Sequence, residues 1–427
     1  MRQVIVICGP LSFRPGSEFF LFAQQMRRTL SLLADIVNRE RGGLRVSGKR
    51  MAVLFKWVDD ASDVFQVTNA TASALRGAPQ ADFAVAPWSS GLTSLASLQS
   101  AADGVLMMSG TASLPSIYTQ NNLTFGVIPA TPTIHNSALA AIVDAAIACD
   151  RAAARGSRRV LRHHDGVTLG ELPPSLYNPS VPCFGGGGCM ASLRLGFIQA
   201  DSTFTRAQCS MPAELAAPFG MPWVKCELPA CEGGVGTIYG SIAEVNPDLI
   251  AEQYTQMKAV LAELQRLNVT VLVGCTYELS AELLAKALME LDYAPLSVST
   301  SVSVSSWGEI LASKGPDHRY FYRYILGATP WHRSRPNRGS WTNLTSEEFV
   351  GRYIARYRET PVYQAIAPVG AIAALFAAIE MAGSIVTAQV VDVLETLSLD
   401  EFYANSACAR ARWCAFSKAH AHSRAFA

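Results

Sequence analysis

Charged residues are scarce in this chain of 427 residues. Only 16% of the positions are Asp, Glu, Lys or Arg, and the net charge at pH 7 is +1. Binding to nucleic acid through its phosphates needs an excess of Lys and Arg, so this balance argues against a nucleic-acid partner. Half of the residues are hydrophobic, which is enough to build sizeable cores and speaks against wholesale disorder.

Long hydrophobic runs are missing as well. The most apolar run, 365–379, has about 15 residues, which is too short to span a bilayer and predicts a buried core helix. The opening stretch "MRQVIVICGPLSF" contains only a short apolar segment. We therefore expect a buried strand there, and no secretory signal is visible.

Sequence signatures of metal, phosphate and nucleophile sites are also lacking. "HHD" at 163–165 has no partner cluster, and the glycines at 185–188 lack the Lys-Ser/Thr of a phosphate loop. "DDASD" at 59–63 is interpreted as a turn at the end of a strand. No Ser-His-Asp or Cys-His set has a nucleophile-elbow context. We predict neither a metal nor a cofactor.

Ten cysteines leave the question of disulfides open. Cys183 and Cys189 form one close pair, and Cys226 and Cys231 another, but neither spacing is that of a zinc site. Disulfides and free buried thiols are both compatible with these spacings. The sequence assigns no pairing.

Apolar strands and amphipathic helices alternate along two parts of the chain. Strands are expected at 4–8, 51–58 and 83–86, separated by helices at 17–38 and 64–77. This β-α-β-α-β order predicts a parallel sheet with helices on both faces. A second series begins near residue 193, with strands at 194–200, 269–274 and 295–304 and helices at 246–268 and 280–291. The fold class is therefore α/β, with two sheets.

Two segments break this pattern. Residues 157–192 contain several prolines and a run of glycines without periodicity, and we interpret them as an irregular insertion. From residue 407 to 427 the composition shifts to Ala, Arg, His and Cys. That tail has neither helical nor strand spacing, so no regular structure is expected in it.

Small and hydroxyl-bearing residues gather in two loops of the first series. In "VAPWSSGLTSLASLQSAADGVLMMSGTAS", residues 85–113, each of two apolar strands is followed by a loop rich in Ser and Thr. Ligands of parallel sheets bind at the carboxyl ends of the strands. Hydroxyls and accessible backbone N–H groups there suit an anionic group. Ordinary helix caps are the alternative interpretation.

Several segments together resemble the type I periplasmic binding proteins, above all the branched-chain amino acid binding proteins of ABC transporters. The segments are "DIVNRERGG", "VDDASD", "APWSSGLT", "MMSGTAS" and "TPVYQAIAPVGAIAALFAAIEMAGS". The same fold serves as the ligand-binding region of natriuretic-peptide and glutamate-type receptors. The resemblance implies two doubly wound parallel-sheet lobes, joined by a hinge, that close on a ligand. Lobe one is expected at 1–133 plus 330–394, and lobe two at 134–329 plus 395–427.

The resemblance also implies a ligand site. By position, Ser90 matches the family's carboxylate-binding serine, and Thr111 and Ser113 match the pair that completes the clamp. Phe204 falls where the family places an aromatic over the ligand, and Thr276 or Tyr277 at another aromatic position. The full candidate set is Trp88, Ser89, Ser90, Thr111, Ala112, Ser113, Phe204, Thr276, Tyr277 and Thr300.

The sequence departs from the family in two places. The family usually grips the ligand's ammonium group with an acid where this chain has Thr300 or Ser301. That leaves open a carboxylate-bearing or amide-like ligand without an amino group. The closing segment "EFYANSACAR" begins like the family's and then diverges, so the family's final strands are expected to be missing.

The resulting prediction is a non-enzymatic protein that captures an amino acid or a similar small polar ligand between its lobes. It serves either uptake with a membrane transporter or sensing as the ectodomain of a receptor with a signalling partner. An enzyme on a doubly wound α/β fold is the alternative from another class. The resemblance implies a periplasmic or extracellular location.

Overall fold

A computed structural model of the chain shows two compact units. The residues that it describes are 4–17, 19–128, 135–154, 193–200, 202–210, 216–217, 220–221, 235–238, 247–301, 325–327, 331–403, 405–409 and 413–416. Unit 1 holds the described residues from 4 to 128 and from 331 to 416, and unit 2 those from 135 to 327. The insertion expected at 157–192, with its "HHD" and glycine motifs, lies outside the described residues.

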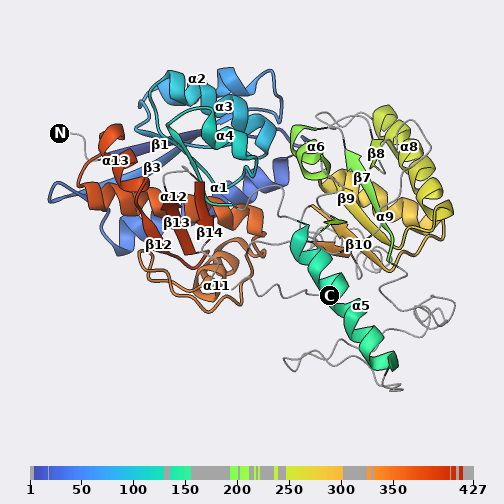
Figure 1. Ribbon diagram of the computed structural model, residues 1–427. Coiled ribbons are helices and arrows are strands. Elements are labelled where there is room, and N and C mark those ends of the chain that lie inside the picture. The colour runs from blue at the N-terminus through green and yellow to red at the C-terminus, as the bar shows by residue number, and fades with distance from the viewer. Residues whose placement is uncertain are drawn as a thin grey trace. The chain divides into compact units, whose positions relative to one another are not determined.

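Unit 1 is built on one sheet with helices on both faces (Figure 1). Among the described residues its strands are, in spatial order, β12 (Ser398–Asp400), β13 (Asn405–Ala409), β14 (Trp413–Phe416), β6 (Thr124–Gly126), β5 (Met107–Ser109), β4 (Phe83–Val85), β1 (Val4–Leu11), β3 (Lys49–Asp59) and β2 (Leu44–Val46). From β6 to β3 all neighbours are parallel. Because β1 lies between β3 and β4, the chain winds outward in both directions, as a doubly wound fold requires.

The helices of unit 1 follow the predicted alternation. They are α1 (Phe20–Asp35), continued by a π-helical turn (Ile36–Glu40), α2 (Val67–Arg76), α3 (Ser90–Ala102), α4 (Pro115–Thr119), α11 (Ser346–Tyr357), α12 (Tyr363–Ala382) and α13 (Thr387–Leu394). Helix α1 buries Phe22, Met26, Leu30 and Leu33, which recur every three or four positions and so lie on one face. Helix α11 starts with the capping box of Thr345 and Glu348.

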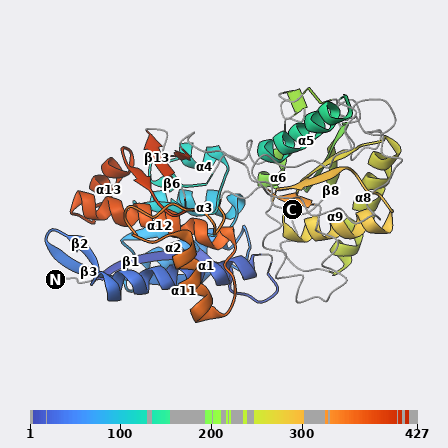
Figure 2. The same ribbon diagram turned by 90° about the horizontal axis from the view of Figure 1, so that it is seen from below.

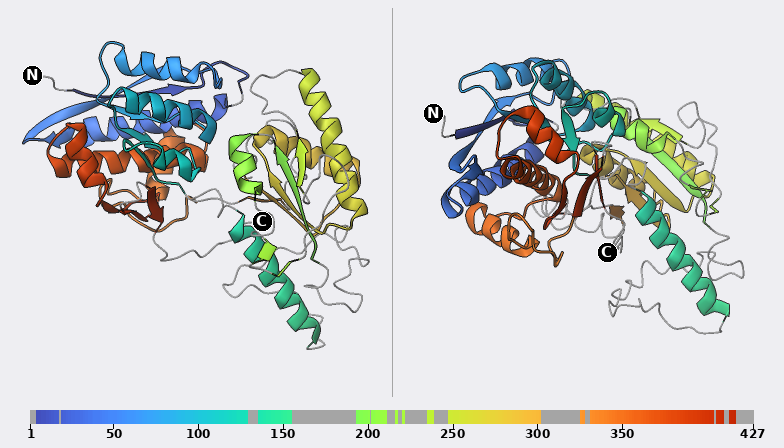
Figure 3. Two further views of the ribbon diagram at one scale, coloured as in Figure 1. Left: turned by 45° about the horizontal axis from the view of Figure 1, so that its top comes forward. Right: turned by 60° about the vertical axis from the view of Figure 1, so that its left-hand side comes forward.

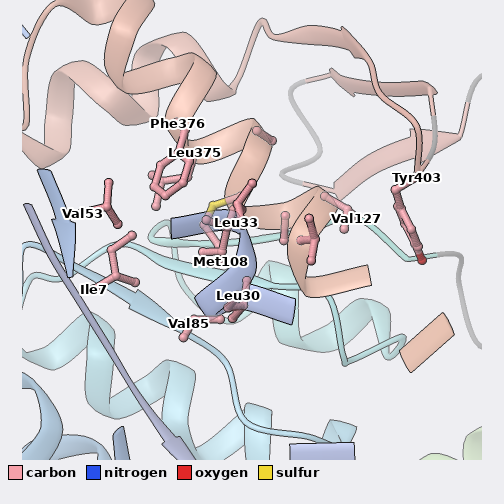
Figure 4. Close-up of a cluster of buried hydrophobic side chains, with 14 of the residues drawn as sticks. Ile7, Leu30, Leu33, Val53, Val85, Met108, Val127, Leu375, Phe376 and Tyr403 are labelled. Carbon is pink, nitrogen blue, oxygen red and sulfur yellow. The ribbon is translucent and has the colours of Figure 1, made fainter. Parts of the chain in front are cut away.

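Helix α12 is the central helix of the unit 1 core. It begins at Tyr363, with Pro368 inside it, and so is longer than the run seen in the sequence. Its twenty residues are long and apolar enough to cross a membrane, but 83% of the most apolar stretch is buried inside the protein. Figure 2 shows it beside α13 and α1. Leu375 and Phe376 pack with Leu30, Leu33 and the strands (Figure 4), so it is a core helix, as predicted.

Unit 2 has its own parallel sheet (Figure 3). Its described strands are, in order, β11 (Ile325–Gly327), β10 (Ser297–Thr300), β9 (Val271–Cys275), β7 (Leu195–Ala200) and β8 (Val235–Ile238). The helices are α5 (Asn136–Ala154), α6 (Thr203–Cys209), α8 (Pro247–Arg266) and α9 (Glu278–Glu290). Two apolar clusters pack against the sheet, one beneath α8 and α9 and one beneath α5 and α6. The α/β fold class with two parallel-sheet bodies is thus confirmed.

The end of the chain does not behave as predicted. We expected 395–427 in the second lobe, with no strands in the tail, but β12, β13 and β14 extend the unit 1 sheet beyond β6. β13 pairs antiparallel with both its neighbours, and Trp413 of β14 pairs with Gly126 of β6. Backbone groups make these pairings. A sequence without apolar alternation can therefore still add strands at a sheet edge. Residues 417–427 lie outside the described part.

Candidate functional site

Two loops of unit 1 meet at the carboxyl edge of its sheet. One runs from β4 into α3, and the other from β5 into α4. The candidate residues on them are almost fully buried: Trp88, Ser89, Ser90, Thr111, Ala112 and Ser113. β4 and β5 are neighbours in the sheet, and neighbouring parallel strands deliver their loops to the same edge. We call Ser89, Ser90, Ser109, Thr111 and Ser113 the hydroxyl cluster.

Hydrogen bonds tie the two loops to each other. The Ser90 Oγ accepts from the backbone N–H of Ser113 at 3.2 Å. The Thr111 hydroxyl donates to the carbonyl of Pro87 at 2.5 Å. Within the second loop, the Ser109 Oγ accepts from the N–H of Ala112 at 3.2 Å. The structure thus brings together the serine and the pair that the sequence predicted, with oxygen atoms and N–H groups from both loops.

Ser89 combines a helix cap with a strained backbone. Its Oγ accepts from the N–H of Leu92 at 3.2 Å and so caps α3. The capping interpretation is therefore correct for this residue. Its φ of 86° and ψ of 149° lie in a region that residues other than glycine rarely adopt. Strain of this kind persists where the surrounding structure enforces it, often at binding sites.

Trp88 forms an apolar wall beside the cluster. Its ring stacks on Phe22 of α1 with a centroid distance of 5.2 Å. Only 7% of the residue is exposed, and its indole N–H has no acceptor among the described residues. A buried donor without an acceptor is costly, so this N–H is available to a ligand or an ordered water.

Asp60 adds a buried carboxyl group at the end of β3. Its Oδ1 accepts from the Ser12 hydroxyl at 2.6 Å and from the N–H of Ser62 at 2.9 Å. Burial raises the pKa of Asp60 to about 6. Asp59 and Asp63 accept from backbone N–H groups within the same turn, as the strand-end interpretation expected. In the part of the chain that the structure describes, no three His, Cys, Asp or Glu side chains could hold a metal ion.

An aromatic pair lies at the carboxyl edge of the unit 2 sheet. Phe204, in the first turn of α6, stacks on Tyr277 after β9 at a centroid distance of 5.2 Å. A capping box formed by Ser202 and Thr205 begins α6. We call Phe204 and Tyr277 the aromatic pair. The structure therefore brings together two candidates that are 73 positions apart in the sequence.

The remaining unit 2 candidates surround the end of β9. Thr276 is fully buried, and its hydroxyl has no partner among the described residues, while its N–H donates to the Ser301 Oγ at 3.0 Å. Thr300 is also fully buried at the end of β10. Thr300 and Ser301 occupy the place where the family resemblance implies an acid. Both are neutral.

Sequence reasoning missed two features of this edge. Cys209 of α6 and Cys275 of β9 form a disulfide across 66 positions. The His135 Nε2 lies 3.6 Å from the Cys275 Sγ, and its Nδ1 lies 3.1 Å from the Ser299 Oγ. Complete burial lowers the pKa of His135 to about 4, so the ring is neutral at pH 7. With ten cysteines, no spacing in the sequence could single out this pair.

Comparison with known proteins rests on structure alone, because no family model and no curated relative matches the chain. A periplasmic binding protein type 1 from Bordetella pertussis is 15% identical, with a TM-score of 0.65 over 97% of this chain and 94% of that one. A Rhodopseudomonas palustris ABC-transporter solute-binding protein in complex with benzoate is 13% identical. Its TM-score is 0.65 over 96% of this chain and 90% of that one. A leucine-binding protein from Thermotoga maritima is 14% identical, with a TM-score of 0.64 over 96% of this chain and 92% of that one. The chain therefore has the fold of the type I periplasmic binding proteins, as the sequence predicted.

Proposed function

We propose that this protein is a non-enzymatic solute-binding protein for small organic carboxylates, with aromatic carboxylates preferred over amino acids. The hydroxyl cluster of unit 1 is the carboxylate-binding group of this proposal, and the aromatic pair of unit 2 is its ring-binding surface. The protein acts in the periplasm or outside the cell and delivers its ligand to an ABC transporter.

The hydroxyl cluster is the observation that carries this proposal. Ser90, Thr111 and Ser113 gather hydroxyl and N–H groups at one edge. In its bond with Ser113 the Ser90 Oγ accepts, so its O–H proton can donate a short hydrogen bond to an oxygen anion without a Lys or Arg. The Trp88 indole N–H offers a further donor. An interaction between such a donor and a charged oxygen contributes about 1.5–3 kcal/mol.

The aromatic preference rests on unit 2. Thr300 and Ser301 offer no negative charge for an ammonium group, whereas Phe204 and Tyr277 offer a stacking surface. An aromatic ring in contact with such a pair gains about 0.5–1.5 kcal/mol beyond the burial of its area. Two of the similar solved structures hold benzoate and 3,4-dihydroxybenzoate, which supports an aromatic acid as the first ligand to test.

Thermal unfolding in the presence of benzoate, leucine and benzamide tests the proposal. A ligand at 100 times its Kd adds about 2.7 kcal/mol to the free energy of unfolding and raises the midpoint. We expect benzoate to raise it most, leucine less, and benzamide, which lacks the charge, least. A shift with leucine alone would overturn the aromatic preference. The absence of any shift across a panel of aromatic and aliphatic carboxylates would overturn the function.

The Ser90→Ala variant tests the position of the carboxylate. Loss of the Oγ removes a bond to the ligand or to Ser113 and should weaken benzoate binding by about 1.5–3 kcal/mol, roughly 10- to 150-fold. Ser94→Ala is the matched control, since Ser94 lies on the same helix but hydrogen-bonds with Gln120. We expect isothermal titration calorimetry to show unchanged affinity for the control. Equal affinities of the two variants would place the carboxylate elsewhere.

A further inference from the structure

The disulfide of unit 2 joins the two segments that carry the aromatic pair. Cys209 is the last residue of α6, whose first turn contains Phe204. Cys275 is the last residue of β9, and Tyr277 follows two positions later. The covalent bond between Cys209 and Cys275 therefore restrains the segments on both sides of the ring–ring contact.

Helix α6 is short and packs on β7 and β9. It has only seven residues, and isolated helices of that length are not stable. Its first turn is fixed by the Ser202 and Thr205 capping box and by the bond from the Thr205 hydroxyl to the Ala200 carbonyl. At its last turn, Cys209 is 2% exposed and bonded to Cys275. The disulfide thus anchors the end of α6 that the capping box does not reach.

His135 supports the other half of the bridge. Its ring lies between the Cys275 Sγ and the Ser299 Oγ, at 3.6 and 3.1 Å. Cys275 is fully buried and His135 is 1% exposed. Cys275 is held in the sheet because β9 pairs with β7 and β10, and His135 packs against its sulfur. The disulfide therefore joins α6 to a fixed strand.

We propose that the Cys209–Cys275 disulfide is a positioning element, which holds Phe204 against Tyr277 and so sets the preference for aromatic ligands. This inference rests on the proposed function, since it concerns the ring-binding surface named there. With the bridge intact, the two rings present one fixed surface. With the bridge open, α6 moves more freely and the stacking contribution falls, while the hydroxyl cluster of unit 1 is unaffected.

Opening the bridge needs a two-electron reductant of the dithiol class. One thiolate of the dithiol attacks a sulfur of the bridge, which breaks the S–S bond and forms a mixed disulfide. The second thiol of the reagent then displaces the protein sulfur. Cys209 and Cys275 end as two thiols with two added protons and two added electrons, and the dithiol ends as a cyclic disulfide.

Ligand selectivity in a Cys209→Ala/Cys275→Ala variant tests the proposal. Benzoate and cyclohexanecarboxylate have the same charge and similar size, but only benzoate has a π face. We expect benzoate affinity to fall about three- to tenfold, the range of one aromatic contact, and cyclohexanecarboxylate affinity to change less than twofold. An unchanged ratio of the two affinities would overturn the proposal, because a bridge that only stabilises the fold would leave this ratio alone.

A double-mutant cycle with Phe204→Leu sharpens this test. That variant keeps the bridge and loses the ring, so it should lower the affinity ratio by itself. Removing the bridge in the Phe204→Leu background should then have no further effect on the ratio. Additive effects of the two changes would show that the bridge does not act through Phe204, and would overturn the proposal.

Amide hydrogen exchange gives a readout that needs no ligand. We expect amides in α6 (Thr203–Cys209) to exchange on the order of tenfold faster in the bridge variant, and those in α1 to be unchanged. Unchanged exchange in α6 overturns the positioning role even if ligands bind. Faster exchange with no carboxylate binding to the wild-type chain supports the positioning role and refutes the proposed function. If the variant does not fold, wild-type chain reduced with dithiothreitol gives the same comparison.

Discussion

Unit 1 buries carboxylic acids, whereas unit 2 buries a histidine. Among the described residues, unit 1 buries two carboxylic acids: Asp60, which follows β3, and Glu401, which accepts hydrogen bonds from Trp341 and Thr342. Burial raises the pKa of both carboxyl groups. Unit 2 buries the imidazole of His135, whose pKa burial lowers to about 4. The same physical cause, loss of hydration of the charged form, therefore gives the two units opposite responses to acid.

Acidification should change the stabilities of the two units in opposite directions. The folded pKa of His135 is below its ordinary 6.5, so the unfolded state binds more protons between pH 6.5 and 4, and unit 2 loses stability as the pH falls through that window. The folded pKa of Asp60 is above its ordinary 3.8, so unit 1 gains stability as the pH falls from about 6 to 3.8. Each effect is on the order of 3 kcal/mol.

Urea unfolding at pH 7 and at pH 4.5 measures both effects. Pulse labelling of amides, read on peptides from α1 and from α8, follows each unit separately. Asp60→Asn should reduce the pH dependence of unit 1 alone, with Glu401 responsible for the remainder, and His135→Asn should reduce that of unit 2 alone. If both units lost stability equally in acid, and neither variant changed that loss, these buried groups would not be its cause.

The edges of the two units also differ in how they are held. In unit 1 the loop after β5 packs directly on the backbone of α12, where a Cβ at Gly110 would lie 2.4 Å from atoms of Ala367 and Pro368. In unit 2 a disulfide restrains the loop region after β9. Close packing thus fixes the hydroxyl cluster, and a covalent bond fixes the aromatic pair.

Gly110→Ala should therefore lower both the stability of unit 1 and its affinity for carboxylates. Overpacking against a backbone that cannot yield costs about 1–3 kcal/mol, and the displaced Thr111 and Ser113 should weaken carboxylate binding. Gly351→Ala is the matched control, because Gly351 lies inside α11 with no atom within 4 Å of a Cβ. Alanine there should stabilise the protein by about 0.5–1 kcal/mol. Denaturant unfolding and calorimetry measure both, and a tolerated alanine at 110 would contradict the packing argument.

Local patterns predicted much of this molecule. The helix expected at 17–38 and the alternation of strands and helices each depend on neighbouring residues, so the sequence displays them. Placing Ser90 beside Ser113 also succeeded, because consecutive strands of a parallel sheet send their loops to one edge.

Features that depend on distant partners were not predictable. The pairing of Cys209 with Cys275 and the burial of His135 are decided by three-dimensional packing. The strands of the tail were missed because edge pairing uses backbone groups, which no side-chain pattern reports. The role of Asp60 as a buried acid was likewise hidden in a motif that reads as a simple turn.

The smallest predicted effect distinguishes the two helix caps at these edges. Ser89 caps α3 with a φ of 86°, whereas Ser202 caps α6 with an extended φ of −136°. Glycine in place of a capping serine loses only a few tenths of a kcal/mol, but at Ser89 it also relieves backbone strain worth about 1–3 kcal/mol. Ser89→Gly should therefore stabilise unit 1 by about 1 kcal/mol, and Ser202→Gly should slightly destabilise unit 2. Chemical denaturation of both variants compares them. A loss of stability in Ser89→Gly would mean that the cap outweighs the strain, whereas a gain accompanied by weaker benzoate binding would mean that the strained serine is maintained for the ligand.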